Sequence, residues 1–393
     1  MLGDPGVARA SAPPRRFLFA VPPLAAHVTA PAAVAAELAR RGHKVAWTGH
    51  RPTLEARLRS RSRIFSALGD DDAARLRGDG LPHDPGDLRA LWEDALVPLG
   101  HAMMPGVETA LDRFRPDAVV ADQLVLAASA AARRRGVPWA TCAATPTELT
   151  RPLAGRPDDE RRVRERIGAF QLDHGIDDLA DLRFSDHLVL AFTTGALLGD
   201  TSLFPDHFAF VGPVLDRPAP VAFPWDRLDG RPAVLVSLGA AGGQERERFL
   251  RAAAEAVRGL DVQAVVVAPP GTLGDAPPNV LVRDQVPRLK LLERAAAVVC
   301  DGGYGAVCDA LAHGVPLVAA PAGGDQPIIA GLVEQAGAGT TVGFGDAGPD
   351  ELRAALTAVL ADGPHRVAAG RVRDSFAAAG GAAEAADRLE KLA

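Results

Sequence analysis

The sequence predicts an α/β protein with two doubly wound, Rossmann-like domains that face a central cleft. Short apolar runs alternate with helical segments along most of the 393 residues, and this alternation stops and restarts once. Strands that alternate with helices in this way form parallel sheets covered by helices. The interruption is a proline-crowded stretch at 214–232, which we interpret as a linker between the domains.

The first domain is expected to cover residues 16–213, after a disordered lead-in at 1–15 that is rich in Ala, Gly, Pro and Arg. The apolar run at 17–21 is its first strand, and the helix that follows is expected to end at Gly42, a residue suited to a helix C-terminus. The dinucleotide fingerprint Gly-x-Gly-x-x-Gly does not follow the first strand. Further strands are expected at 45–48, 117–121, 137–142, 188–191 and 208–211.

The second domain is expected to cover residues 233–393. A chain of this length can supply two ordinary domains with a core each. Helices are expected between its strands, and the last helices begin near residue 349. The expected strands are 233–239, 262–267, 280–282, 296–300 and 316–319.

Composition excludes several classes of function. The net charge of −6 gives no general attraction to nucleic acid or to an anionic membrane. No apolar run reaches the length of a membrane span, and the N-terminus lacks the apolar core of a signal peptide. Three cysteines are too few for a disulfide framework and lack the spacing of metal ligands. We therefore expect a cytoplasmic protein without a metal site, nucleic-acid partner or membrane insertion. The sequence leaves open whether the protein forms a homodimer.

The most informative segment is 298–327. It reads as an apolar strand, a turn containing Gly302, Gly303 and Gly305, a helix, a second strand and a polar loop. A glycine turn that opens a helix presents unpaired N–H groups to an anion, and the helix dipole favours negative charge there. Ligands of such sheets gather at the carboxyl ends of the strands. We therefore place the active site at this turn.

The same segment carries a family resemblance. Gly302, Gly303 and Gly305, the acid Asp309 and the pair Asp325 and Gln326 resemble the nucleotide-sugar signature of GT-B glycosyltransferases. The closest branch in pattern is the bacterial one that glycosylates macrolides, polyketides and related natural products. The resemblance covers nearly the whole chain. It implies two domains in the GT-B arrangement and a final helix that crosses back to the first domain.

This resemblance assigns donor-binding roles to residues near the strand ends of the second domain. For the donor diphosphate these are Ser237, Gly239, Gly302, Gly303, Gly305 and Ala306. Gln285 and Val286 are assigned to the nucleoside base and Asp309 to the ribose hydroxyls. Asp325 and Gln326 are assigned to the hydroxyls of the transferred sugar. Without the resemblance, the last pair is a polar loop before a helix.

Four positions depart from the family pattern. The turn carries Asp301 where relatives have His, and Ala306 where they have a hydroxyl residue. Asp309 replaces the usual Glu, and Gln285 stands where many relatives stack an aromatic residue on the base. Asp301 is the largest departure, because two unit charges about 4 Å apart repel by roughly 4 kcal/mol at an effective dielectric constant near 20. The cost is avoided if Asp301 points away from the ligand, is protonated or pairs with a cation.

His27 and Asp122 are the candidate catalytic pair, and both follow predicted strands. A neutral imidazole is suited to take a proton from an acceptor hydroxyl. Resembling enzymes place their general base at the position of His27 and, in some, an aspartate at that of Asp122 to hold the far ring nitrogen. The structural alternative at both positions is a helix cap.

The acceptor is expected to lie in the first domain against Trp92, Met103 and Phe170, although large apolar residues there also suit a core. The predicted reaction is inverting transfer of a sugar from a dTDP- or UDP-linked donor to a hydroxyl of a hydrophobic natural product, with no cofactor beyond this co-substrate. One alternative is an enzyme of the same fold that performs elimination, cyclisation or isomerisation without a nucleotide sugar. Another is a non-catalytic auxiliary protein.

Overall fold

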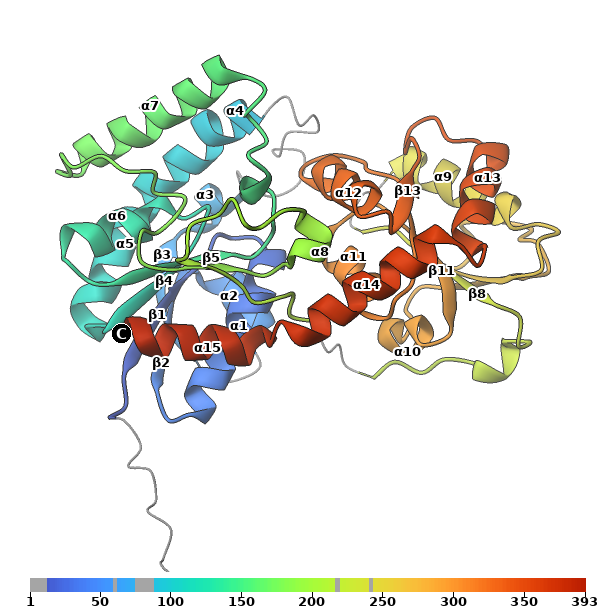
Figure 1. Cartoon of the computed structure of the whole chain (residues 1–393), viewed down its shortest axis with the longest axis horizontal. Coiled ribbons are helices and arrows are strands. Elements are labelled where there is room, and N and C mark those ends of the chain that lie inside the picture. Colours follow the sequence, from blue (N-terminus) through green and yellow to red (C-terminus); the bar gives the residue numbers. More distant parts are fainter. Residues whose placement is uncertain (1–12, 59–61, 75–87, 216–219, 240–242) are drawn as a thin grey trace, which may run out of the picture.

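The computed structural model describes residues 13–58, 62–74, 88–215, 220–239 and 243–393. Over these ranges the chain forms two parallel sheets, one of seven strands and one of six, and each is packed between helices (Figure 1). The predicted α/β class with two doubly wound sheets is confirmed. The expected lead-in falls mainly on residues 1–12, and part of the expected linker on 216–219; both lie outside the described residues.

The first lobe holds the seven-stranded sheet, with strand order β3-β2-β1-β4-β5-β6-β7. Its strands are β1 (Arg16–Ala20), β2 (Lys44–His50), β3 (Arg63–Leu68), β4 (Ala118–Asp122), β5 (Trp139–Ala143), β6 (Val189–Ala191) and β7 (Phe208–Phe210). Its helices are α1 (Ala26–Arg40), α2 (Arg51–Arg57), α3 (Asp70–Ala74), α4 (Leu88–Ala90), the π-helical η3 (Leu91–Leu96), α5 (Val97–Phe114), α6 (Leu126–Arg134), the short η4 (Glu148–Thr150), α7 (Pro157–Asp173) and α8 (Gly195–Leu198).

The second lobe holds the six-stranded sheet, with strand order β10-β9-β8-β11-β12-β13. It is preceded by the short turn η5 (Trp225–Arg227). Its strands are β8 (Ala233–Ser237), β9 (Gln263–Val267), β10 (Val280–Arg283), β11 (Ala295–Cys300), β12 (Leu317–Ala319) and β13 (Gly339–Thr341). The helices that follow are α9 (Gly243–Ala256), α10 (Arg288–Leu292), α11 (Tyr304–Ala312), α12 (Gln326–Gln335), α13 (Pro349–Leu360), α14 (Pro364–Ala378) and α15 (Gly381–Leu392).

Alternation along the strands divides each lobe into two cores. In β1, Phe17 and Phe19 pack on the face covered by α1 and α15, whereas Leu18 packs on the face covered by α5, α6 and α7. In β8, Val234 and Leu235 separate in the same way, toward α9 and α13 on one face and toward α10, α11, α12 and α14 on the other. Successive side chains of a strand point to opposite faces, and apolar residues on both faces bury the strand completely.

The strand order places a ligand site in each lobe. The first sheet reverses its order between β1 and β4, and the second reverses between β8 and β11. Open α/β sheets bind ligands outside the carboxyl ends of the strands at such a switch point. Asp122 and Ser237 end β4 and β8, Asp301 directly follows β11, and His27 lies in the first turn of α1, the helix that follows β1.

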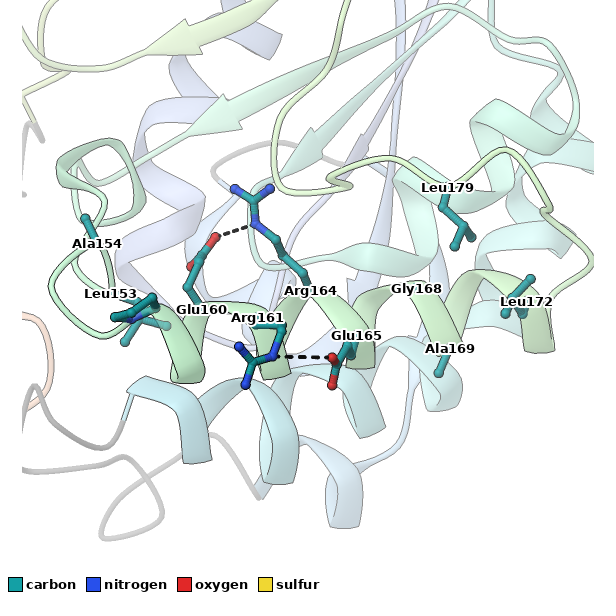
Figure 2. A pocket seen from close by; sticks show the side chains of 11 residues that line it. Leu153, Ala154, Glu160, Arg161, Arg164, Glu165, Gly168, Ala169, Leu172 and Leu179 are labelled. Atoms are coloured by element: carbon teal, nitrogen blue, oxygen red, sulfur yellow. Dashed lines mark hydrogen bonds and ion pairs between the residues drawn. The ribbon is translucent and has the colours of Figure 1, made fainter.

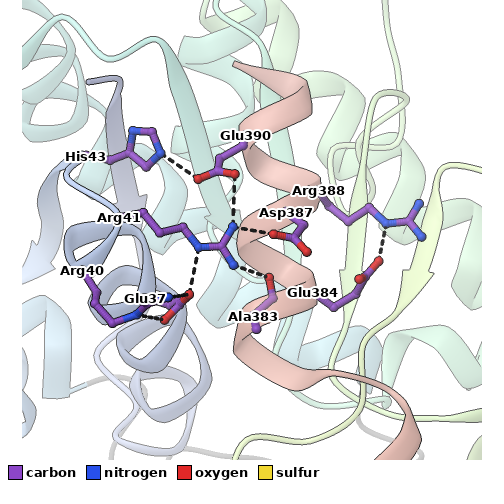
Figure 3. A network of polar contacts seen from close by, with 9 residues as sticks. All are labelled: Glu37, Arg40, Arg41, His43, Ala383, Glu384, Asp387, Arg388 and Glu390. Carbon is purple, nitrogen blue, oxygen red and sulfur yellow. Dashed lines mark hydrogen bonds and ion pairs between the residues drawn. The ribbon is translucent and has the colours of Figure 1, made fainter. Parts of the chain in front are cut away.

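The last helices tie the lobes together. Helix α14 packs on α11 of the second lobe, and α15 packs on α1 of the first (Figure 1). The chain turns between them at Gly380, whose φ of +83° is a conformation that suits glycine. Leu389 of α15 is buried in the core of the first lobe. Figure 3 shows the polar contacts beside it, in which Arg41 bonds to the acids Glu37, Asp387 and Glu390.

Candidate active site

A cavity of about 710 Å³ lies between the two lobes. Its wall includes His27 and Gln123 from the first lobe and Ser237, Asp301 and Asp325 from the second. Cavities of this size are typical of sites for small molecules. The two switch points therefore open into one shared site.

His27 lines this cavity and contacts Asp122, which is buried. His27 lies in the first turn of α1, and Asp122 is the last residue of β4, which pairs with β1. The Nδ1 atom of His27 lies 2.9 Å from Oδ2 of Asp122. The other carboxylate oxygen accepts the N–H of Leu124 at 3.0 Å. These contacts hold the imidazole ring in one orientation, with Nδ1 turned toward the carboxylate.

The surroundings of His27 favour its protonated form. Burial lowers the pKa of His27, because it penalises the charged imidazolium. The charge and hydrogen bond of Asp122, together with the charge of Asp325 from the second lobe, act in the opposite direction and leave the pKa raised above its ordinary value of 6.5. The pair is thus arranged to stabilise an imidazolium once His27 has taken a proton.

Asp301 is the centre of a hydrogen-bond network at the glycine turn. Its Oδ2 accepts the N–H of Gly239 at 2.9 Å and Nε2 of Gln326 at 3.1 Å, and its Oδ1 accepts the N–H of Gly303 at 3.2 Å. Only 4% of Asp301 is exposed, although it lines the cavity. All three partners are neutral N–H groups.

Asp325 and Gln326, the two residues expected to bind the sugar, differ in their contacts. Oε1 of Gln326 accepts the N–H groups of Ala322 at 2.8 Å and Gly323 at 3.2 Å, while Nε2 donates to Asp301. Both ends of this amide are therefore engaged. Asp325 lines the cavity and accepts the hydroxyl of Thr147, from the first lobe, at 3.4 Å. Of the pair, Asp325 is better placed to meet a ligand.

The N-terminus of α11 opens onto the cavity. Gly303 is its N-cap residue, and Tyr304, Gly305 and Ala306 of its first turn line the wall. The N–H groups of a first helical turn have no partner within the helix, and the helix dipole adds partial positive charge there. A Cβ added at Gly305 would meet nothing within 4 Å, so the space in front of this turn is open. The turn has the features of an anion site.

An ion pair lies farther along the same wall. Nη2 of Arg288, the first residue of α10, lies 2.5 Å from Oδ2 of Asp309 on α11. Asp309 is buried, whereas Arg288 is about one-third exposed at its side chain, and both line the cavity. A guanidinium and a carboxylate offer donors and acceptors to the hydroxyls of a ribose. The pair thus marks a second polar patch on the donor side.

The structure does not bring all expected donor residues to the cavity. Ser237 and Gly239 line it. Gln285 is exposed and Val286 packs partly on the core of the second lobe, and neither is in the cavity wall. Arg288, which does line the cavity, follows these two residues after Pro287.

The expected acceptor residues are core residues, which corrects their assignment. Trp92, Met103 and Phe170 are each 0% exposed and belong to the core beneath α5 and α7. A side chain without exposed surface cannot contact an acceptor in this structure. The apolar wall of the first lobe that keeps exposed surface is formed by other residues, namely Leu24, Leu91 and Leu124.

A buried charge network supports this acceptor side. Glu148 lines the cavity and accepts Nε1 of Trp92 at 3.2 Å and Nη1 of Arg183 at 3.3 Å. Burial raises the pKa of Glu148, while the charge of Arg183 acts against this rise. Trp92 thus contributes to the site through its indole N–H, by holding Glu148 in place.

The polar residues of the wall that sequence reasoning missed include Thr147, Glu148, Arg288 and Tyr304. Thr147 and Glu148 follow β5, and the rule that ligands gather at strand ends would have selected them. Arg288 and Tyr304 lie inside the segments that resemble the family signature. The hydroxyl of Tyr304 donates to the carbonyl of Phe192 at 2.5 Å, a contact between the lobes that sequence alone does not predict.

A second hollow lies on the outside of α7 (Figure 2). Its charged groups pair along the helix, with Glu160 bonded to Arg164 at 2.7 Å and Arg161 near Glu165 at 3.8 Å. Side chains paired in this way on a helix surface are ordinary solvated groups. The central cavity, where a dyad and a helix N-terminus face each other, is the better candidate for the active site.

Two classes of site find no support in the described part of the chain. Its His, Cys, Asp and Glu side chains form no group of three or more that could hold a metal ion. None of its helices combines the length and apolar character that crossing a membrane requires.

Comparison with known proteins gives a consistent result. Residues 252–392 match the family model described as erythromycin biosynthesis protein CIII-like, C-terminal domain. The chain is 30% identical to 4'-demethylrebeccamycin synthase of Lentzea aerocolonigenes over 96% of its own length and 99% of that protein. It is 30% identical to demethyllactenocin mycarosyltransferase of Streptomyces fradiae, over 95% and 86%. The crystal structure of a calicheamicin glycosyltransferase aligns with a TM-score of 0.79 and 25% identity, over 97% of this chain and 98% of that one.

Proposed function

This chain belongs to the GT-B family of natural-product glycosyltransferases that use nucleotide sugars, and we propose that it moves a sugar from a dTDP- or UDP-linked donor to a hydroxyl of a hydrophobic acceptor, with inversion at the anomeric carbon. The observation that carries the proposal is the shared cavity. His27, which contacts Asp122, lines it from the first lobe, and the N-terminus of α11 lines it from the second.

His27 is proposed to be the general base. Its Nδ1 faces Asp122, so Nε2 is the ring atom that would take the proton of the acceptor hydroxyl. The acceptor oxygen would then attack the anomeric carbon in a single displacement as the bond to the diphosphate breaks. Asp122 is a positioning residue that would fix the ring and stabilise the imidazolium.

The leaving diphosphate is proposed to lie at the start of α11. Unpaired N–H groups of Tyr304, Gly305 and Ala306 would stabilise the negative charge that develops on it. Asp309 and Arg288 would then lie at the ribose, and Asp325 at the sugar hydroxyls. We do not assign the binding of the donor's nucleoside base to Gln285 or Val286, because neither residue lines the cavity.

The division of labour between the lobes follows from these placements. Residues 16–213 are proposed as the acceptor domain, 214–232 as the linker and 233–393 as the donor domain. The leucine-rich wall of the first lobe, with Leu24, Leu91 and Leu124, supports an apolar acceptor, because burial of its surface would contribute most of the affinity.

The test is transfer from a panel of dTDP- and UDP-sugars to hydrophobic polyketide and aromatic acceptors. We expect His27→Ala to lower kcat by about 10²- to 10⁴-fold, because it removes the base, while nucleotide affinity is retained. His187→Ala is the matched control, since His187 is exposed and lies outside the cavity wall. Full activity of His27→Ala, or a loss confined to nucleotide binding, would refute the assignment.

A further inference from the structure

We propose that Glu148 is a specificity residue of the acceptor site, whose carboxylate accepts a hydrogen bond from a second polar group of the acceptor. This group is a hydroxyl or an amino group other than the hydroxyl that receives the sugar. The inference rests on the proposed function in taking the first lobe as the acceptor side. It concerns binding of the acceptor and needs no step of the chemistry at His27.

Glu148 presents a carboxylate to the cavity from a fixed position. It is the first residue of η4, lines the cavity and is 6% exposed. Its Oε1 accepts Nε1 of Trp92 at 3.2 Å, and its Oε2 accepts Nη1 of Arg183 at 3.3 Å. An ionised carboxylate has about four lone-pair sites, so each oxygen can accept one more hydrogen bond. The side chain is therefore held in place and still has capacity for a ligand.

The charge of Glu148 is shared with other acids around one cation. Arg183 lies 2.8 Å from both Glu160 and Asp181, but 3.3 Å from Glu148. Glu148 is the most buried of these three carboxylates and the least closely paired. Burial raises its pKa, because burial penalises the charged form. A hydrogen-bond donor supplied by a ligand would offset part of that penalty.

The polar groups beside Glu148 have already used their hydrogens. The hydroxyl of Thr147 donates to Asp325 at 3.4 Å, so its contact of 3.3 Å with the hydroxyl of Thr145 is donated by Thr145. The side-chain amide of Gln123 donates to the carbonyl of Thr145 at 3.2 Å and to its hydroxyl at 3.5 Å. This stretch of the wall thus offers a ligand acceptors and no donors. A polar group that binds here must itself be a donor.

The apolar part of the same wall makes this hydrogen bond selective. Leu24, Leu91 and Leu124 line the cavity from the first lobe and keep exposed surface. A hydrophobic acceptor that covers them without a donor would leave the Glu148 carboxylate buried and short of a partner, which costs affinity. The preferred acceptors are therefore hydrophobic molecules with two hydroxyls, or with a hydroxyl and an amine.

The experiment is calorimetric titration of the full chain with rigid aromatic acceptors, followed by transfer assays with dTDP-glucose and UDP-glucose. Naphthalenediols, biphenyldiols and dihydroxyanthraquinones supply different spacings. Each diol is compared with its monomethyl ether, whose second oxygen cannot donate, and with the analogue that carries an aminomethyl group there. In at least one series we expect the diol or the aminomethyl analogue to bind the native chain about tenfold more tightly than the ether. The tighter of the two identifies a hydroxyl or an ammonium as the bound group.

Two variants and a control assign this preference to Glu148. Glu148→Met removes the carboxylate at similar volume and is expected to abolish the preference. Glu148→Gln keeps an acceptor oxygen without the charge, so we expect it to weaken binding of the aminomethyl analogue about tenfold and binding of the diol less. Glu160→Gln is the control, because Glu160 bonds the same Arg183 but does not line this cavity, and we expect it to keep the native preference.

The native chain alone can overturn the inference, whatever the folding of the variants. Equal affinity for diol, ether and aminomethyl analogue in all three series, or binding of none of them, would do so. A preference that survives in Glu148→Met would assign it to another group, and an equal loss in Glu160→Gln would show a structural effect of Arg183. The proposed function fails separately: selective binding without sugar transfer would refute it and leave the inference standing, whereas transfer without selectivity would do the reverse.

Discussion

At the scale of single residues, the contact between His27 and Asp122 sets the pH dependence of the proposed reaction. The base must be neutral to accept a proton, and the pKa of His27 is raised above 6.5. We therefore expect kcat/KM to rise with pH through a value above 6.5, because the active neutral form is lost as pH falls. A pH profile of the native chain measures this limb.

Asp122→Asn separates positioning from acid–base effects. It removes the charge that raises the pKa of His27, so the acidic limb should move to lower pH while the maximal rate falls. A profile that keeps its limb at the native pH would show that His27 is not the titrating group. Asp117→Asn is the control, because Asp117 directly precedes the same strand β4, accepts the N–H of Arg16 and does not line the cavity.

Single residues also show how far sequence reasoning reached. It selected His27 and Asp122 as polar groups that follow predicted strands, and it selected Asp301 and Asp325 through the resemblance of their segment to the family signature. It could not foresee that Asp301 occupies the N–H groups of Gly239 and Gly303, because this contact depends on how two loops close over each other. It also chose Trp92 in place of Leu91, since a one-residue shift on a helix exchanges a core position for a cavity position.

At the scale of elements, α15 follows the second lobe in sequence but packs on the first lobe, which it is expected to stabilise. Leu389 is 0% exposed among residues of α1 and β1. We expect Leu389→Ala to lower the free energy of unfolding of the first lobe by about 2–5 kcal/mol, because it leaves a cavity in a packed core. Denaturant unfolding of this variant measures the change.

The matched control for Leu389 is Leu203→Ala, since Leu203 is 78% exposed and the same atoms are removed. Equal stability of the two variants would show that α15 does not brace the first lobe. The ion pairs around Arg41 in Figure 3 are partly exposed, so we expect them to contribute less than the apolar contact. The family resemblance implied this crossing helix, but the acids that meet Arg41 could not be paired with it from sequence.

At the scale of the whole molecule, two similar lobes enclose one site. The fold class was predictable because buried parallel strands are nearly continuous apolar runs, which stand out between helices. The contacts that join the lobes were not, since they pair residues far apart in the chain. Thr194 bonds Ser375 at 2.7 Å, and the N–H of Gly381 donates to the carbonyl of Val211 at 2.7 Å. Ser375 lies in α14 and Gly381 in α15, the two helices that cross between the lobes.

The central claim is that the cavity between the lobes transfers a sugar from a nucleotide to an acceptor with inversion. Its most direct test is a quantitative reaction of the native chain with a nucleotide sugar and an acceptor that it accepts, in which released nucleotide, glycosylated acceptor and anomeric configuration are all measured. We predict one nucleoside diphosphate released for each acceptor glycosylated, and a product whose anomeric configuration is opposite to that of the donor. Retained configuration, or conversion of the acceptor without a nucleotide sugar, would contradict the account.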